Sequence, residues 1–190
     1  MKQWIGPLKV LKIDNNKITT SYGIFSSVLK LNVGYTYRFL INDDIIIDYG
    51  MLCVDLVVLI DNKDSYKLLT IKRKNEPYKG YNALPGGVID ENETILDAAL
   101  RELKEETSLE VDNLFFVGYF DKPYRDPRNK NCTSYVYCKI LNEKPIVKAS
   151  DDATDCEWIE ISYDGEISDV EMAFDHADMI KKAIEIKLNE

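Results

Sequence analysis

The segment from Val54 to Ile60 constrains the fold more than any other part of the chain, because nearly all of its residues are apolar. A strand with one covered face alternates apolar and polar residues, whereas a continuous apolar run indicates a strand covered on both faces. Apolar residues also recur at helical spacing over Thr94–Thr107 and Met172–Leu188. We therefore predict an α/β protein in which helices cover both faces of a sheet.

The remaining strands are predicted from short runs rich in β-branched and aromatic residues and bounded by turn signals. After the first strand these runs are Leu68–Ile71, Phe115–Phe120, Ser134–Ile140 and Cys156–Ile161. The first 48 residues contain only strand-like runs, at Ile18–Tyr22, Val28–Val33 and Tyr35–Ile41. We therefore expect a β-rich N-terminal extension or small subdomain over residues 1–48, and the main domain over residues 49–190.

The net charge of −9 limits the partners that the chain can bind. A general nucleic-acid binder needs a basic surface, so we expect no nucleic-acid partner. An anionic substrate would need local cations, from a metal ion or from arginine, to overcome this charge. The sequence has no apolar run long enough for a signal peptide or a membrane span, and its four cysteines form no C-x-x-C pair. These features favour a cytoplasmic protein without a membrane partner.

Glu102, Glu105 and Glu106 lie three or four residues apart in the predicted helix and therefore share one of its faces. Like charges at this spacing destabilise a helix by roughly 0.2–0.5 kcal/mol per pair. A bound cation would remove this repulsion, and hard carboxylate oxygens suit Mg²⁺ or Mn²⁺. A solvated acidic surface is the alternative. The opposite face is expected to pack onto the sheet through Leu96, Ala99, Leu100 and Leu103.

Two neighbouring features favour metal binding over a solvated surface. Pro85-Gly86-Gly87 precedes the helix and allows the backbone to approach a ligand closely. Arg101 can reach Glu105 one turn further along the helix, or a carboxylate in the preceding loop. A glycine loop followed by an acidic helix thus predicts a site for cations and phosphate.

The pattern from Gly87 to Leu109 resembles the Nudix box, with Glu93 and Arg101-Glu102-Leu103 at its further fixed positions, followed by Glu105-Glu106. The resemblance implies a Nudix-type α/β/α sandwich with a mixed β-sheet. It also implies a pyrophosphohydrolase that acts on phosphoric anhydrides with Mg²⁺ or Mn²⁺ as cofactor. By the same resemblance, Glu93 and Arg101 orient the loop and the helix, and the metal ligands are Glu102, Glu105, Glu106 and the Gly87 carbonyl.

Ser108 departs from the pattern of the family, which usually has glycine at this position. That glycine ends the helix in a left-handed conformation. A serine in this conformation would cost roughly 1 kcal/mol, or else the helix ends in a different way. The departure concerns the end of the helix and leaves the glutamates intact.

The sequence leaves the general base of the reaction open. Glu105 and Glu102 are the candidates within the box. Asp151 and Asp152 are the candidates outside it, in a polar loop where ordinary turn chemistry is the alternative.

Segments outside the box resemble the branch of the family that hydrolyses ADP-ribose. They are Leu68–Lys74 with Gly80–Gly87, Arg125–Arg128 with the strand that follows, and Ala173–His176. The resemblance implies metal-dependent hydrolysis of a nucleoside diphosphate linked to another group, with ADP-ribose giving AMP and ribose 5-phosphate. The alternatives are another nucleotide (NADH, 8-oxo-dGTP or a dinucleoside polyphosphate), or a non-enzymatic ADP-ribose sensor.

The N- and C-terminal parts bear on these alternatives. Sensors of this branch add a winged helix that binds DNA, and we expect none here because only one predicted helix lies between the last predicted strand and Glu190. Many members of the family form dimers, so residues 1–48 are a candidate for homodimer formation or for covering the substrate.

Candidate residues for substrate binding come from these same segments. Arg125 and Arg128 would present forked donors to a phosphate, and a surface turn is an equal alternative. Arg73 either adds positive charge near the glycine loop or only ends a strand. Tyr81 is a candidate surface for stacking adenine. His176 is expected to be structural rather than catalytic, after a core phenylalanine and a helix-capping aspartate.

Overall fold

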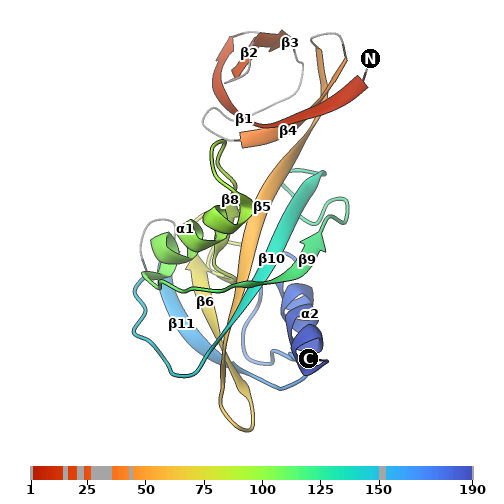
Figure 1. Ribbon diagram of the computed structural model, residues 1–190. Helices are drawn as coiled ribbons and strands as arrows, with labels where there is room; N and C mark the ends of the chain where they lie inside the picture. The colour runs from red at the N-terminus through yellow and green to blue at the C-terminus, as the bar shows by residue number, and fades with distance from the viewer. Residues whose placement is uncertain are drawn as a thin grey trace. The chain divides into compact units, whose positions relative to one another are not determined.

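The computed structural model describes residues 2–14, 17–20, 24–26, 36–42, 45–149 and 153–189. The chain forms two compact units (Figure 1). The first unit comprises Met1–Cys53, Val88–Thr94 and Asp121–Thr133, and the second comprises Val54–Gly87, Ile95–Phe120 and Ser134–Glu190. Among the described residues, the helices are too short or too polar to cross a membrane.

The first unit is built from strands. They are β1 (Lys2–Asp14), β2 (Lys17–Thr20), β3 (Ile24–Ser26), β4 (Thr36–Asn42) and the first part of β5 (Ile45–Asp61). β1 pairs antiparallel with β2 and with β4, whereas the single pairing of β3 with β5 is parallel, so the sheet is mixed. The described residues of this region lie in strands, as expected of a β-rich segment, and residue 48, after which the domain boundary is predicted, lies within β5.

Two of the three strands predicted for this region correspond to β2 and β4. Neither β1 nor β3 was predicted, because charged residues, Gly6 and Pro7 interrupt the alternation of β1, and β3 is only three residues long. The predicted strand Val28–Val33 lies outside the described residues.

The second unit contains a sheet in which the order of the strands is β11-β6-β5-β10-β9. β6 pairs antiparallel with β5 and with β11, and β10 pairs antiparallel with β9. The short strand β7 joins β6, and β8 joins β5. These strands are β6 (Tyr66–Arg73), β7 (Asn82–Ala83), β8 (Gly86–Val88), β9 (Phe115–Phe120), β10 (Cys132–Leu141) and β11 (Ala153–Ile161).

Both faces of β5 are covered within this unit, as its apolar run predicts. Successive side chains of a strand point to opposite faces. Val57 and Leu59 join one core cluster, and Leu56 and Val58, which alternate with them along the strand, are equally buried. Helix α2 (His176–Leu188) approaches β9 and helix α1 (Ile95–Thr107) approaches β11 (Figure 1). The helix α2 contributes Met179, Ile180, Ala183 and Ile184 to the first cluster.

Helix α1 begins within one residue of its predicted start, whereas α2 begins at His176 rather than at Met172. Met172 instead forms a parallel bridge with Asn82, and the Ala173 amide donates to the Asn82 carbonyl at 2.7 Å. Phe174 then adopts a left-handed conformation with φ of 52°. The predicted start of α2 is therefore wrong by four residues, because the bridge from Met172 to Asn82 and the turn at Phe174 keep these residues out of the helix.

Candidate active site

The loop Leu84–Gly87, called the glycine loop here, is fixed by hydrogen bonds to separate elements. The Leu84 amide donates to Nδ1 of His176 at 2.9 Å, which ties the loop to the start of α2. The Pro85 carbonyl accepts from the Leu56 amide of β5 at 2.9 Å. The first half of the loop therefore has a defined position relative to the sheet.

The two glycines of the loop lie against the acidic helix and the sheet. The Gly86 amide donates to Oε2 of Glu106 at 2.8 Å. A side chain at Gly86 would overlap the carbonyl oxygen of Val54, and one at Gly87 would overlap the carboxylate of Glu102. Both positions therefore require glycine for close approach, as the sequence predicts for this loop.

The three glutamates of α1 share one side of the helix but differ in exposure. The side chain of Glu105 is 44% exposed and that of Glu102 is 14% exposed, whereas Glu106 is buried. Glu106 follows Leu103 by three residues, so it lies beside the buried stripe rather than opposite to it. The acidic side thus borders the core, and Glu105 is its outermost carboxylate.

This orientation corrects one part of the predicted core face of α1. Ala99 and Leu103 are fully buried and Leu100 is half-buried, as expected. Leu96 is 41% exposed and therefore does not pack onto the sheet as predicted. The buried stripe is rotated toward Glu106, and the hydrogen bond from the glycine loop offsets the cost of burying that carboxylate.

Arg101 binds two of the three glutamates. Its Nη1 atom donates to Oε1 of Glu102 at 2.7 Å and to Oε2 of Glu105 at 3.0 Å. The contact with Glu105 confirms that Arg101 reaches one turn along the helix. The guanidinium group thereby offsets the repulsion between neighbouring carboxylates.

The donor atoms of this cluster fit a hard divalent cation. Across the described part of the chain, no three His, Cys, Asp or Glu side chains already converge closely enough to hold a metal ion. Within this cluster, Glu102 and Glu105 contact Arg101, and Glu106 contacts Gly86. Carboxylate oxygens are nevertheless the ligands that Mg²⁺ and Mn²⁺ prefer. A cation here would compete with Arg101 for Glu102 and Glu105.

Ser108 keeps the left-handed conformation that glycine usually supplies, with φ of 59°. Its amide donates to the Lys104 carbonyl at 2.9 Å, which closes the last turn of α1. The Thr107 hydroxyl donates to the Leu103 carbonyl at 2.6 Å and accepts from the Leu109 amide at 3.2 Å. The helix therefore ends in the usual geometry despite the serine.

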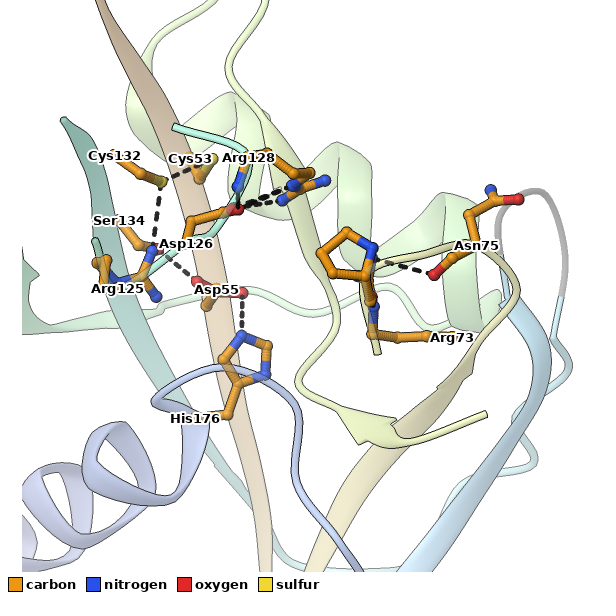
Figure 2. A network of polar contacts seen from close by, with 11 residues as sticks. Cys53, Asp55, Arg73, Asn75, Arg125, Asp126, Arg128, Cys132, Ser134 and His176 are labelled. Atoms are coloured by element: carbon orange, nitrogen blue, oxygen red, sulfur yellow. Dashed lines mark hydrogen bonds and ion pairs between the residues drawn. The ribbon is translucent and has the colours of Figure 1, made fainter. Parts of the chain in front are cut away.

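Asp55 and Ser134 form a buried polar group that the sequence does not predict. The Ser134 hydroxyl donates to one oxygen of Asp55, and Nε2 of His176 lies 3.4 Å from the other (Figure 2). His176 itself is buried, which agrees with the expected structural role. The available signal was an aspartate that interrupts the apolar run Val54–Ile60, because a buried carboxylate needs partners.

Arg73 and Tyr81 lie in one aromatic cluster of the second unit. The Arg73 guanidinium is 4.8 Å from the centroid of the Phe174 ring, and its Nε atom donates to the Pro77 carbonyl at 2.9 Å. Tyr78 packs edge-on against both Phe174 and Tyr81. The charge of Glu171 and a hydrogen bond to it raise the pKa of Tyr81 above its ordinary value. The cluster brings one guanidinium and several rings together near the start of α2.

Arg125 and Arg128 both contact groups of the first unit. Arg128 binds the carboxylate of buried Asp126 with two nitrogens, at 2.6 Å for Nη2 and 3.0 Å for Nε (Figure 2). Arg125 donates to Sγ of Cys132 at 3.4 Å, and this sulfur lies 3.8 Å from that of Cys53. The hydrogen bond with Cys53 and the charge of Arg125 lower the pKa of the Cys132 thiol. These contacts are those of an ordered turn, which was the alternative to phosphate binding for Arg125 and Arg128.

The remaining predicted residues are only partly described. Glu93 accepts a hydrogen bond from the Asp90 amide at 2.7 Å, so its carboxylate holds the turn that precedes α1. Asp151 and Asp152, the candidate bases outside the box, lie outside the described residues.

Comparison with known proteins identifies the family of this fold and loop-helix site. The NUDIX domain family matches residues 51–183, and the chain therefore belongs to the Nudix family. An ADP-ribose pyrophosphatase from Methanocaldococcus jannaschii is 36% identical over 130 residues, which cover 68% of this chain and 70% of that protein. The prediction of a Nudix pyrophosphohydrolase is thereby confirmed at the level of the family.

Two further relatives extend the comparison. The ADPR responsive transcriptional repressor NtrR from Acinetobacter baylyi is 28% identical over 135 residues. The matched region covers 70% of this chain and 52% of the length of that protein. The solved NUDIX domain of Shewanella oneidensis NrtR, complexed with ADP ribose, is 26% identical with a TM-score of 0.65. That match covers 73% of this chain and 88% of the other.

Proposed function

We propose that the protein hydrolyses ADP-ribose to AMP and ribose 5-phosphate with Mg²⁺ or Mn²⁺. The observation that carries this proposal is the glycine loop held against the glutamates of α1, with Gly86 bound to Glu106 and Gly87 packed on Glu102. Similarity to an ADP-ribose pyrophosphatase supports the choice of substrate.

Each part of the site has a role in this reaction. Glu102, Glu105 and Glu106, with the Gly87 carbonyl, would hold the cations, and the bound cations would neutralise the charge of the diphosphate. Glu105 is the most exposed of the three carboxylates and is our candidate to take the proton from the attacking water. Mutagenesis of Glu105, Glu102 and the loop aspartates would decide which of them is the general base.

The proposal is tested with a panel of substrates in Mg²⁺ and in Mn²⁺. The panel comprises ADP-ribose, NADH, 8-oxo-dGTP and a diadenosine polyphosphate, and we expect AMP and ribose 5-phosphate from the first. Glu105→Gln and Glu106→Gln should each lower kcat by at least about 100-fold, because cations supply several kcal/mol of charge stabilisation. A Glu110→Gln variant on the exposed surface is the matched control. Activity close to that of the unmodified protein in both site variants would contradict the assignment of the metal ligands. No turnover of ADP-ribose would contradict the proposed substrate.

A second candidate function is binding of ADP-ribose without hydrolysis. The observation that favours it is the similarity to an ADPR responsive repressor and to a NUDIX domain complexed with ADP ribose. Calorimetric binding of ADP-ribose without the appearance of AMP would support this candidate over the enzyme.

A further inference from the structure

His176 joins the start of α2 to the glycine loop. It is the chain's single histidine, and its side chain is buried. Its Nδ1 atom accepts a hydrogen bond from the Leu84 amide at 2.9 Å. A ring nitrogen that accepts a hydrogen bond carries no proton, so the imidazole is neutral with its N–H on Nε2.

Asp55 accounts for this tautomer. Nε2 of His176 lies 3.4 Å from Oδ1 of Asp55, and the other carboxylate oxygen accepts from the Ser134 hydroxyl (Figure 2). All three side chains are buried. The ring is therefore held from the sheet side by β5 and β10, and its second nitrogen is directed at the loop.

The contact between His176 and Leu84 is linked to the acidic helix through the backbone of the glycine loop. Leu84 is two residues from Gly86, whose amide binds Glu106, and three residues from Gly87, which packs against Glu102. A displacement of about 1 Å at reacting groups is enough to reduce a rate by about 100-fold. The Leu84 contact is thus placed to determine where the glycine loop meets the glutamates.

We propose that His176 is a positioning residue of the active site, which fixes the glycine loop against the glutamates of α1 through Leu84 while Asp55 holds its tautomer. The inference rests on the proposed function for its effect on catalysis. It does not require His176 to touch the substrate or to transfer a proton. It differs from a purely structural role because only the nitrogen facing Leu84 matters for the loop.

A matched pair of variants separates the two ring nitrogens. In His176→Asn the side-chain oxygen can lie near the position of Nδ1 and accept from the Leu84 amide. In His176→Gln the longer side chain places its amide near Nε2 and leaves Leu84 without this acceptor. The two variants have similar polarity, so a difference between them reports on the hydrogen bond to Leu84.

The first measurement is hydrogen exchange at the Leu84 amide, followed by NMR without substrate or metal. We expect His176→Asn to keep this amide protected and His176→Gln to expose it. The second measurement is hydrolysis of ADP-ribose across a Mn²⁺ titration. His176→Gln should lower kcat by about 10- to 100-fold with little change in KM for ADP-ribose, as for the partners that orient metal ligands, whereas His176→Asn should retain most of kcat.

Equal amide exchange and equal kcat in the two variants would overturn the inference. If the unmodified protein does not hydrolyse ADP-ribose, the proposed function fails, and exchange at Leu84 together with Mn²⁺ binding by calorimetry still decides the role of His176. Asp55→Asn keeps an oxygen that can accept a hydrogen bond from Nε2, so it should leave the tautomer of His176 unchanged. Asp55→Asn should therefore keep the Leu84 amide protected, whereas protection that survives in His176→Gln would contradict the proposal.

Discussion

Ser108 holds a backbone conformation that L side chains disfavour, with φ of 59° at the end of α1. Ser108→Gly should therefore raise the free energy of unfolding by about 0.5–1 kcal/mol, because glycine removes the left-handed strain. The gain is reduced by the lost contact of the serine hydroxyl with the Lys148 carbonyl at 3.3 Å. Chemical denaturation of both proteins measures the difference.

Ser108→Ala is the control for this change. It removes the hydroxyl contact but keeps the strain, so it should be no more stable than the unmodified protein. Equal stability of the alanine and glycine variants would show that the conformation at this position contributes nothing to stability. Activity should stay unchanged in both variants, because the substitution lies beyond the glutamates.

At the residue scale, local spacing predicted the acidic cluster but not the polar group behind it. The glycines and glutamates lie within one short stretch, so sequence distance alone places them together. Asp55 and Ser134 are separated by 79 positions and meet only through the pairing of β5 with β10. No local pattern carries such a contact, and an aspartate within an apolar run was the one indication that it existed.

At the element scale, the bounds of α1 were predicted well because the spacing of its apolar residues is a property of its own sequence, although Leu96 lies outside the buried stripe. The extra residues predicted for α2 failed for the opposite reason. Met172 pairs with Asn82 of β7, a contact from a distant part of the chain that overrides local helix preference. β1 was missed because proline and lysines obscure its alternation.

The exposure of Leu96 and Leu103 gives a test of how α1 faces the sheet. Leu103→Ala should lower the free energy of unfolding by about 2–5 kcal/mol, because the side chain is fully buried and leaves a cavity. Leu96→Ala removes the same atoms from a site that is 41% exposed and should cost well under half as much. Denaturant midpoints compare the two variants directly. Similar losses in both would contradict the orientation of the helix.

At the scale of the whole molecule, the charge of −9 opposes an anionic substrate and favours divalent cations. Among the described residues of the site, Arg101 is a positively charged side chain that already binds two glutamates. Metal ions would therefore supply much of the positive charge that a diphosphate requires. Binding of the metal should precede productive binding of the substrate.

Metal binding should stabilise the folded protein even without substrate. A ligand that binds only the folded state at about 100 times its dissociation constant adds roughly 2.7 kcal/mol of stability. For a chain of 190 residues, this corresponds to a rise of about 5–10 °C in the thermal midpoint. The measurement is thermal unfolding with Mg²⁺ or Mn²⁺ and again after addition of a chelator.

The combined variant Glu105→Gln, Glu106→Gln should lose this metal-dependent shift, because two carboxylate ligands are gone. Glu110→Gln removes an exposed carboxylate near the end of α1 and serves as its counterpart, with the shift retained. A shift that is equal in both variants would place the metal away from the acidic side of α1. A shift lost only with the two site glutamates would tie stability to the same carboxylates that the proposed hydrolysis needs.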